Sequence, residues 1–205
     1  MVNFIITEKE MFNRINLVRC KIALGFVTTA IVVYFVGMDS IVNQHYAFSV
    51  WLHVLAGIVW IGLLYYFNFV QVPAMGAALA DSDGPGPAAI GKYIAPRALL
   101  WFRMAAATTW ILGLVLLALQ SRGMDGIIGA FTLAQGYQVI GIGAWMGTIM
   151  AFNVWFIIWP NQQKILGMKD ASAEEIATAK KNAALASSIN VILSVPMLLT
   201  MIAWH

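Results

Sequence analysis

Long apolar stretches alternate with short polar segments along this chain. An α-helix rises about 1.5 Å per residue, so roughly 20 apolar residues cross a hydrocarbon layer of about 30 Å. The pattern therefore predicts an all-α integral membrane protein, a bundle of five transmembrane helices that forms one membrane domain over residues 1–205. The predicted spans lie at about residues 21–38, 46–72, 98–120, 134–159 and 183–204.

Proline and glycine mark the predicted ends of these spans. We expect Pro73 to end the second span and the Gly- and Pro-rich segment 76–97 to form a flexible loop. Residues 121–130 are rich in glycine and are expected to form a turn region, and Pro160 is expected to stop the fourth span. The connections therefore add no further domain.

A helix start is predicted shortly before the fifth span. Ser172 is followed three residues later by Glu175, which is the spacing of a capping box. The helix that begins there is expected to continue into the fifth span, with a kink at Pro196.

The composition agrees with a membrane protein and excludes several other classes. Hydrophobic residues make up 61% of the chain and charged residues 10%, whereas soluble domains average about 25% charged residues. The net charge of +3 arises in the connections between spans, so it does not indicate nucleic-acid binding. The single cysteine, Cys20, excludes an intrachain disulfide and a cysteine-based metal cluster.

The lysines and arginines predict the orientation in the membrane. If the amino terminus is cytoplasmic, ten of them fall in cytoplasmic segments, Arg122 alone falls in an external turn, and Arg103 lies within a span. We therefore expect a multi-pass protein of the bacterial inner membrane with a periplasmic carboxyl terminus. The ten cytoplasmic residues are Lys9, Arg14, Arg19, Lys21, Lys92, Arg97, Lys164, Lys169, Lys180 and Lys181.

The second span contains a single ionisable residue, His53. On a helix, positions 53, 57, 60, 64, 68 and 71 share one face, which places Gly57 one turn from His53 and Trp60 next to Gly57. Because Gly57 has no side chain, a flat group bound to the imidazole can lie against the helix backbone there. Haem fits that description. The alternative is that His53 only hydrogen-bonds a neighbouring helix.

A second histidine is predicted at the same depth as His53. Trp51 and Trp204 are typical of the external membrane interface, and His205 follows Trp204 directly. Two histidines at matched depth can hold one haem iron from both faces, the arrangement suited to electron transfer. The chain has no Cys-x-x-Cys-His motif, so the haem is expected to be non-covalent haem b. His45, in a turn, is the fallback ligand.

A group of polar residues is predicted towards the cytoplasmic side of the spans. Each polar group in lipid is expensive unless it faces a partner or a cavity. One interpretation is a pocket for an anion, a planar heterocycle or the haem propionates, since arginine suits carboxylates. The other is hydrogen bonding between helices, with Arg103 extending towards the membrane surface. The residues are Asn68, Gln71, Arg97, Arg103, Asn153 and Asn190.

The spans contain no Ser-His-Asp set and no carboxylate pair, which excludes most hydrolytic chemistry. An enzyme of this sequence would be a redox enzyme. No other motif in the spans indicates a catalytic group.

Several segments together resemble the membrane domain of the bacterial membrane-bound urate oxidase, or urate hydroxylase, family. The span around His53 is also similar to the haem-binding span of the bacterial membrane protoporphyrinogen oxidase family. Both resemblances imply that His53 is a haem ligand in a His-x-x-x-Gly-x-x-Trp helix, and the closing motif of the first implies the same for His205. The segments are 51–62, 99–113 and 153–164, together with Asn190, Pro196, Met201 and His205.

The first resemblance implies a haem protein in electron transfer, one that oxidises urate or a related purine and passes the electrons to a periplasmic cytochrome c. The alternatives are a non-catalytic accessory subunit of a larger respiratory or photosynthetic membrane complex and a protoporphyrinogen oxidase-like enzyme. In each case the lipid bilayer is a partner and nucleic acid is not, and a homo-oligomer is compatible with all three.

Overall fold

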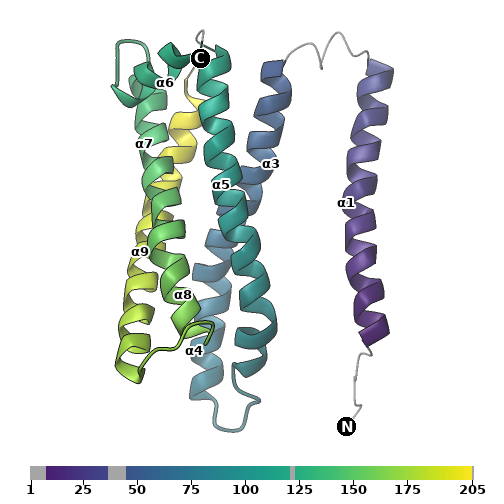
Figure 1. The fold of residues 1–205 in the computed structure, drawn as a ribbon, viewed down its shortest axis with the longest axis vertical. Helices are drawn as coiled ribbons and strands as arrows, with labels where there is room; N and C mark the ends of the chain where they lie inside the picture. The colour runs from purple at the N-terminus through teal and green to yellow at the C-terminus, as the bar shows by residue number, and fades with distance from the viewer. Residues whose placement is uncertain (1–7, 37–44, 121–122, 205) are drawn as a thin grey trace. The chain divides into compact units, whose positions relative to one another are not determined.

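The computed structural model describes residues 8–36, 45–120 and 123–204, and every regular element within them is a helix (Figure 1). The prediction of an all-α chain is therefore confirmed for these residues. The chain divides into two compact units, Met1–Phe48 and Ser49–His205. Whether the two units form the single predicted membrane domain stays a prediction.

The first unit is built on helix α1 (Glu8–Val36). Its apolar part, Cys20–Phe35, is shorter than the apolar helices of the second unit. Many of its large apolar side chains are exposed, and Phe35 is the most exposed at 81%. Such a surface suits a lipid environment, where apolar side chains do not need to be buried in protein.

The second unit contributes the long helical runs of the bundle. Among the described residues, four runs are long and apolar enough to cross a membrane, and they correspond to the last four predicted spans. Figure 1 shows that successive runs point in opposite directions, so each packs antiparallel to the next. The runs are His45–Ala80, Ile90–Gln120, Gln138–Ile165 and Ala173–Ile202.

Three of these runs change their winding along their length. The first consists of α3 (His45–Tyr66), the π-helical η1 (Phe67–Gln71) and α4 (Val72–Ala80). The second consists of the π-helical η2 (Ile90–Ile94) and α5 (Ala95–Gln120). The third consists of α7 (Gln138–Phe152), the π-helical η3 (Asn153–Ile158) and α8 (Trp159–Ile165).

The prolines do not end these helices, which corrects the predictions for Pro73 and Pro160. Pro73 lies in the first turn of α4 and Pro160 in the first turn of α8. Each comes two residues after a π-helical segment, as does Pro96 after η2. Proline cannot donate to the preceding turn and its ring crowds that turn, and a wider π-helical turn before it relieves both problems.

Two predicted connections are also corrected. The expected loop 76–97 is helical at both ends, because α4 continues to Ala80 and helix resumes before η2. The expected turn at 121–130 contains a short helix, α6 (Met124–Phe131). Its Gly129 packs where a Cβ would lie 2.9 Å from the Tyr137 ring, so this glycine serves close packing.

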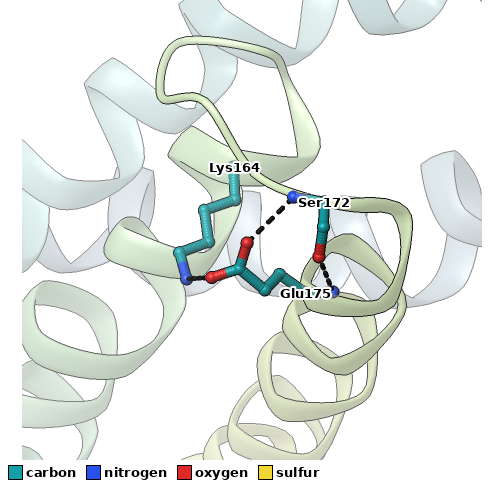
Figure 2. Close-up of polar contacts among 3 residues, drawn as sticks. All are labelled: Lys164, Ser172 and Glu175. Carbon is teal, nitrogen blue, oxygen red and sulfur yellow. Dashed lines mark hydrogen bonds and ion pairs between the residues drawn. The ribbon is translucent and has the colours of Figure 1, made fainter.

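The last run is helix α9 (Ala173–Ile202), and its predicted capping box is confirmed (Figure 2). The Glu175 amide donates to Ser172 Oγ over 3.2 Å, and the Ser172 amide donates to Glu175 Oε2 over 2.8 Å. Lys164 Nζ lies 3.4 Å from Glu175 Oε1, which links the end of α8 to the start of α9. The helix continues through Pro196, where the kink stays a prediction.

The most extensive helix packing in the second unit is between α7 and α9. A Cβ on Gly143 would lie 2.6 Å from Thr200 Oγ1, and a Cβ on Gly147 would lie 3.6 Å from Met197 Sδ. Small residues of this kind let helix backbones approach each other in a membrane. Elsewhere on α9, which also packs against η3 and α8, the small residues Ala179, Ala183 and Ala186 are buried.

Candidate functional site

The face of α3 that carries His53 points into the second unit. Trp60 is 2% exposed and Leu64 is fully buried, whereas Ile58, on another face of the same helix, is 64% exposed. The face continues into η1, where Phe67 packs edge-on against Phe102 of α5 with ring centroids 5.5 Å apart. The face of α3 predicted from the spacing of His53, Gly57 and Trp60 is therefore an inward face, and α5 lies opposite it.

His53 lies against a part of α5 that has no side chain. A Cβ on Gly113 would lie 3.3 Å from His53 Cε1 and 3.8 Å from Nδ1, so this edge of the imidazole faces the α5 backbone. The Thr109 backbone interacts with the ring as a hydrogen-bond partner. This interaction is not well aligned, and the buried Nδ1 forms no hydrogen bond of good geometry among the described residues. The Thr109 hydroxyl does not supply one, because it donates to the Ala105 carbonyl over 2.7 Å.

Gly57 lies opposite Thr109, one turn further along the same pair of helices. A Cβ there would lie 3.8 Å from Thr109 Cγ2, which is an ordinary packing distance. The imidazole of His53 thus has a glycine beside it on its own helix and another on the helix it faces. The Nδ1 edge of the imidazole therefore packs against the α5 backbone at Gly113.

Three further buried atoms lack hydrogen-bond partners. Among the described residues, the buried side-chain nitrogens and oxygens in this state are His53 Nδ1, Trp60 Nε1, Gln71 Oε1 and Arg103 Nη1. The first three lie on the inward face of α3 and η1, and Arg103 lies on α5. Most buried polar groups in proteins are hydrogen-bonded. These unpartnered atoms are concentrated on two facing helical runs.

Arg103 is held by two tryptophans from η3 and α8. Its guanidinium carbon lies 3.7 Å from the centroid of the Trp159 ring, a cation–π contact. Its backbone carbonyl accepts a hydrogen bond from Trp155 Nε1 over 3.1 Å. One tryptophan thus fixes the backbone of Arg103 and the other fixes the plane of its side chain.

The other residues of the predicted polar pocket are not gathered around Arg103 by hydrogen bonds. Asn153 Nδ2 donates to Asn190 Oδ1 over 2.8 Å, and Asn190 Nδ2 donates to the Met150 carbonyl over 3.0 Å. Asn68 Nδ2 donates to Ser187 Oγ over 2.8 Å. These three asparagines hold helices together, as in the second interpretation of the group.

Arg97 is exposed and separate from that group. Its Nη1 donates to the Tyr93 carbonyl on its own helical run over 2.6 Å. The guanidinium therefore donates to a backbone carbonyl near the start of its own helical run. The role of Arg97 in a pocket stays a prediction without a contact to support it.

The predicted second haem ligand, His205, lies outside the described residues. Its neighbour Trp204 donates from Nε1 to the Gly136 carbonyl over 2.9 Å. Figure 1 shows that α9 ends at the same end of the second unit at which α3 enters it. His45, the fallback ligand, is the exposed first residue of α3. In the described part of the chain, no three His, Cys, Asp or Glu side chains gather into a metal site.

Sequence reasoning missed three residues of this site: Gly113, Thr109 and Trp159. Gly113 and Thr109 touch the inward face of α3, and Trp159 stacks on Arg103. The isolated glycine in the third span was a usable signal, because glycine within a transmembrane helix often marks close approach of another group. Trp159 had no such signal, because its partner is on another helix.

Comparison with known proteins identifies a family for part of the chain. The family model described as urate oxidase N-terminal matches residues 129–205, which is less than half of the chain and includes α7, η3, α8 and α9. No curated protein and no solved structure matches the chain. The match supports the resemblance to the urate oxidase membrane domain over these helices. The His53 span lies outside it, and the resemblance to protoporphyrinogen oxidase has no support.

Proposed function

We propose that this protein is a membrane-embedded b-type haem protein that transfers electrons. The observation that supports the proposal is the half-buried His53 imidazole, whose buried Nδ1 forms no well-aligned hydrogen bond and whose neighbours on α3 and α5 are Gly57 and Gly113. Ionisable residues inside transmembrane spans are functional by default. A single histidine without other metal-ligating side chains nearby suits an axial haem ligand better than an isolated metal ion.

The residues of this chain would have distinct roles towards the haem. His53 would hold the iron, and Gly113 would fix the imidazole by allowing it to lie against the α5 backbone. Gly57 would leave room beside the helix, and Trp60 Nε1 would donate to a polar edge of the bound group. His205 is proposed as the second ligand. Haem would supply one-electron redox chemistry that no side chain of this chain provides.

The partial family match supports a narrower version of the proposal. In that version, the protein oxidises urate or a related purine and passes the electrons to a periplasmic cytochrome c. The amino terminus would then be cytoplasmic and the carboxyl terminus periplasmic, which the distribution of Lys and Arg supports. Reporter fusions at the two ends test this orientation, and a cytoplasmic signal from the carboxyl-terminal fusion would contradict it.

The absorption spectrum of the purified protein tests the haem proposal directly. We expect a non-covalent b-type spectrum, and we expect His53→Ala to lose most of the bound haem because the iron loses its ligand. His45→Ala is the matched control, since it removes an exposed histidine from the same helix.

Two results would contradict the proposal. One is a wild-type protein that contains no haem and takes up none when haem is added, which would favour the accessory-subunit role. The other is a His53→Ala variant with a full haem complement. His205→Ala should convert a six-coordinate low-spin spectrum to a five-coordinate one, and an unchanged spectrum would reject His205 alone.

A further inference from the structure

Arg103 presents an unneutralised positive charge inside the second unit. Its Nη1 is buried and has no hydrogen-bond partner. Among side chains that the structure describes, the observed ion pair is Lys164 with Glu175, at the exposed connection of α8 and α9. The described acidic side chains lie in connections or in the first turns of helices, and none lies in the middle of a span. The described side chains of the chain therefore offer Arg103 no counter-ion.

The stack on Trp159 determines which part of the guanidinium remains available. A ring centred 3.7 Å from the guanidinium carbon occupies one face of that planar group. The N–H donors of arginine point outward in the plane, so stacking leaves them free to bind in the pattern that matches two oxygens of one anion. Trp155, bonded to the Arg103 carbonyl, restrains the same residue from a second direction. The donor edge is thus held in a fixed orientation before any ligand arrives.

We propose that the donor edge of Arg103 is a binding site for an oxyanion, with two oxygens of a carboxylate or phosphate accepting from the guanidinium. A buried guanidinium N–H group without a hydrogen-bond partner is unfavourable, and an anion that reaches it supplies a charge-assisted hydrogen bond. The source of the oxygens is either a soluble carboxylate or phosphate or the phosphate of an anionic lipid. The proposal does not depend on haem at His53.

The chain provides a closely matched control for this site. Arg97 lies on the same helix and is also an arginine, but it is exposed and bonded to the Tyr93 carbonyl. Arg97→Gln therefore removes the same charge from α5 without touching the stack on Trp159. Arg103→Gln removes the proposed donor edge. Arg103→Lys keeps the charge and the stem but loses the planar pair of donors, so it also serves if Arg103→Gln fails to fold.

The experiment measures binding to purified protein in phosphatidylcholine nanodiscs. Benzoate and inorganic phosphate are titrated by calorimetry, and nanodiscs that also contain phosphatidylglycerol are analysed by native mass spectrometry for retained lipid. We expect saturable binding of at least one of these three probes to wild type and to Arg97→Gln. Binding should weaken by about tenfold or more in Arg103→Gln and Arg103→Lys, as loss of a charge-assisted pair implies.

The pattern of results identifies the source and decides the proposal. Binding of benzoate or phosphate assigns the site to a soluble oxyanion, and retention of phosphatidylglycerol alone assigns it to a lipid headgroup. The proposal is overturned if wild type binds none of the three probes. It is equally overturned if both Arg103 variants bind as wild type does, or if Arg97→Gln loses binding to the same extent.

Discussion

In the second unit, buried polar groups are hydrogen-bonded where α7 and η3 meet α9, but several lack partners where α3 faces α5. Where η3 and α7 meet α9, the amides of Asn153 and Asn190 bond to each other and to the Met150 carbonyl. Where α3 faces α5, His53 Nδ1 and Trp60 Nε1 are also buried, but neither forms a well-aligned hydrogen bond within the described residues. Burial of a polar atom therefore does not by itself decide whether this bundle pairs it.

The comparison separates polar groups that hydrogen-bond between helices from buried polar groups that have no such partner. Helices in lipid associate through close packing of small residues and through hydrogen bonds between helices, and the α7–α9 side uses both. On that side the polar groups hydrogen-bond to one another. On the α3–α5 side, several buried polar atoms have no partner among the described residues, and for this reason we place the proposed haem there and the proposed oxyanion on α5.

The largest loss of stability is expected when a hydrogen bond between η3 and α9 is removed. Asn190 is fully buried, and Asn190→Ala leaves Asn153 Nδ2 without its acceptor and removes one of the two donors to the Met150 carbonyl. We expect the free energy of unfolding to fall by about 2 kcal/mol, from unpaired buried groups and a small cavity. Reversible unfolding in mixed micelles measures it. Asn161→Ala is the control, because Asn161 bonds only to the Ile157 carbonyl of its own helical run; equal losses would contradict the pairing argument.

A somewhat smaller loss is expected from crowding the same side. Gly143→Ala places a Cβ about 2.6 Å from Thr200 Oγ1, a β-branched side chain with little freedom to move, so α7 and α9 must separate. We expect a loss of about 1.5 kcal/mol in the same unfolding assay.

Gly147→Ala provides the control for Gly143→Ala. Its Cβ would meet Met197 Sδ at 3.6 Å, an ordinary distance, and alanine favours the helix by up to about 1 kcal/mol over glycine. This variant should be as stable as wild type or slightly more stable. Two variants of equal stability would show that α7 and α9 are not as close as the structure has them.

The smallest change in stability, and one of opposite sign, is expected from a substitution at an unpartnered atom on the α3–η1 face. Gln71 is buried and its Oε1 has no partner. Gln71→Met keeps the length of the side chain and removes the unpaired oxygen, so we expect stability to stay the same or to rise by up to about 1 kcal/mol in ligand-free protein. A loss comparable to that of Asn190→Ala would mean that Gln71 has a partner in the folded protein, and the contrast between the two sides would then fail.

Much of the fold follows from local features of the sequence. Apolar stretches of sufficient length predicted the last four helical runs, and the Ser172 and Glu175 spacing predicted the start of α9. The spacing of His53, Gly57 and Trp60 predicted one face, and the structure turns that face inward. The predicted helix ends at Pro73 and Pro160 were wrong, because proline disfavours regular helix locally but does not have to end it. In lipid, a helix that stops leaves backbone groups unpaired, so widening one turn is less costly than stopping.

By itself, the sequence determined the helices, their apolar character and the inward face of α3, because hydropathy and helical periodicity depend only on residues near one another in the chain. The tertiary structure decided which polar groups find partners. Asn153 meets Asn190, Arg103 meets Trp159, and His53 meets the bare backbone at Gly113. Each pair joins helices that are distant in the sequence, and whether a buried group is paired depends on what packing brings to it. For that physical reason, only the tertiary structure distinguishes the asparagines that bond to other helices from the arginine and the histidine whose buried nitrogens lack a partner.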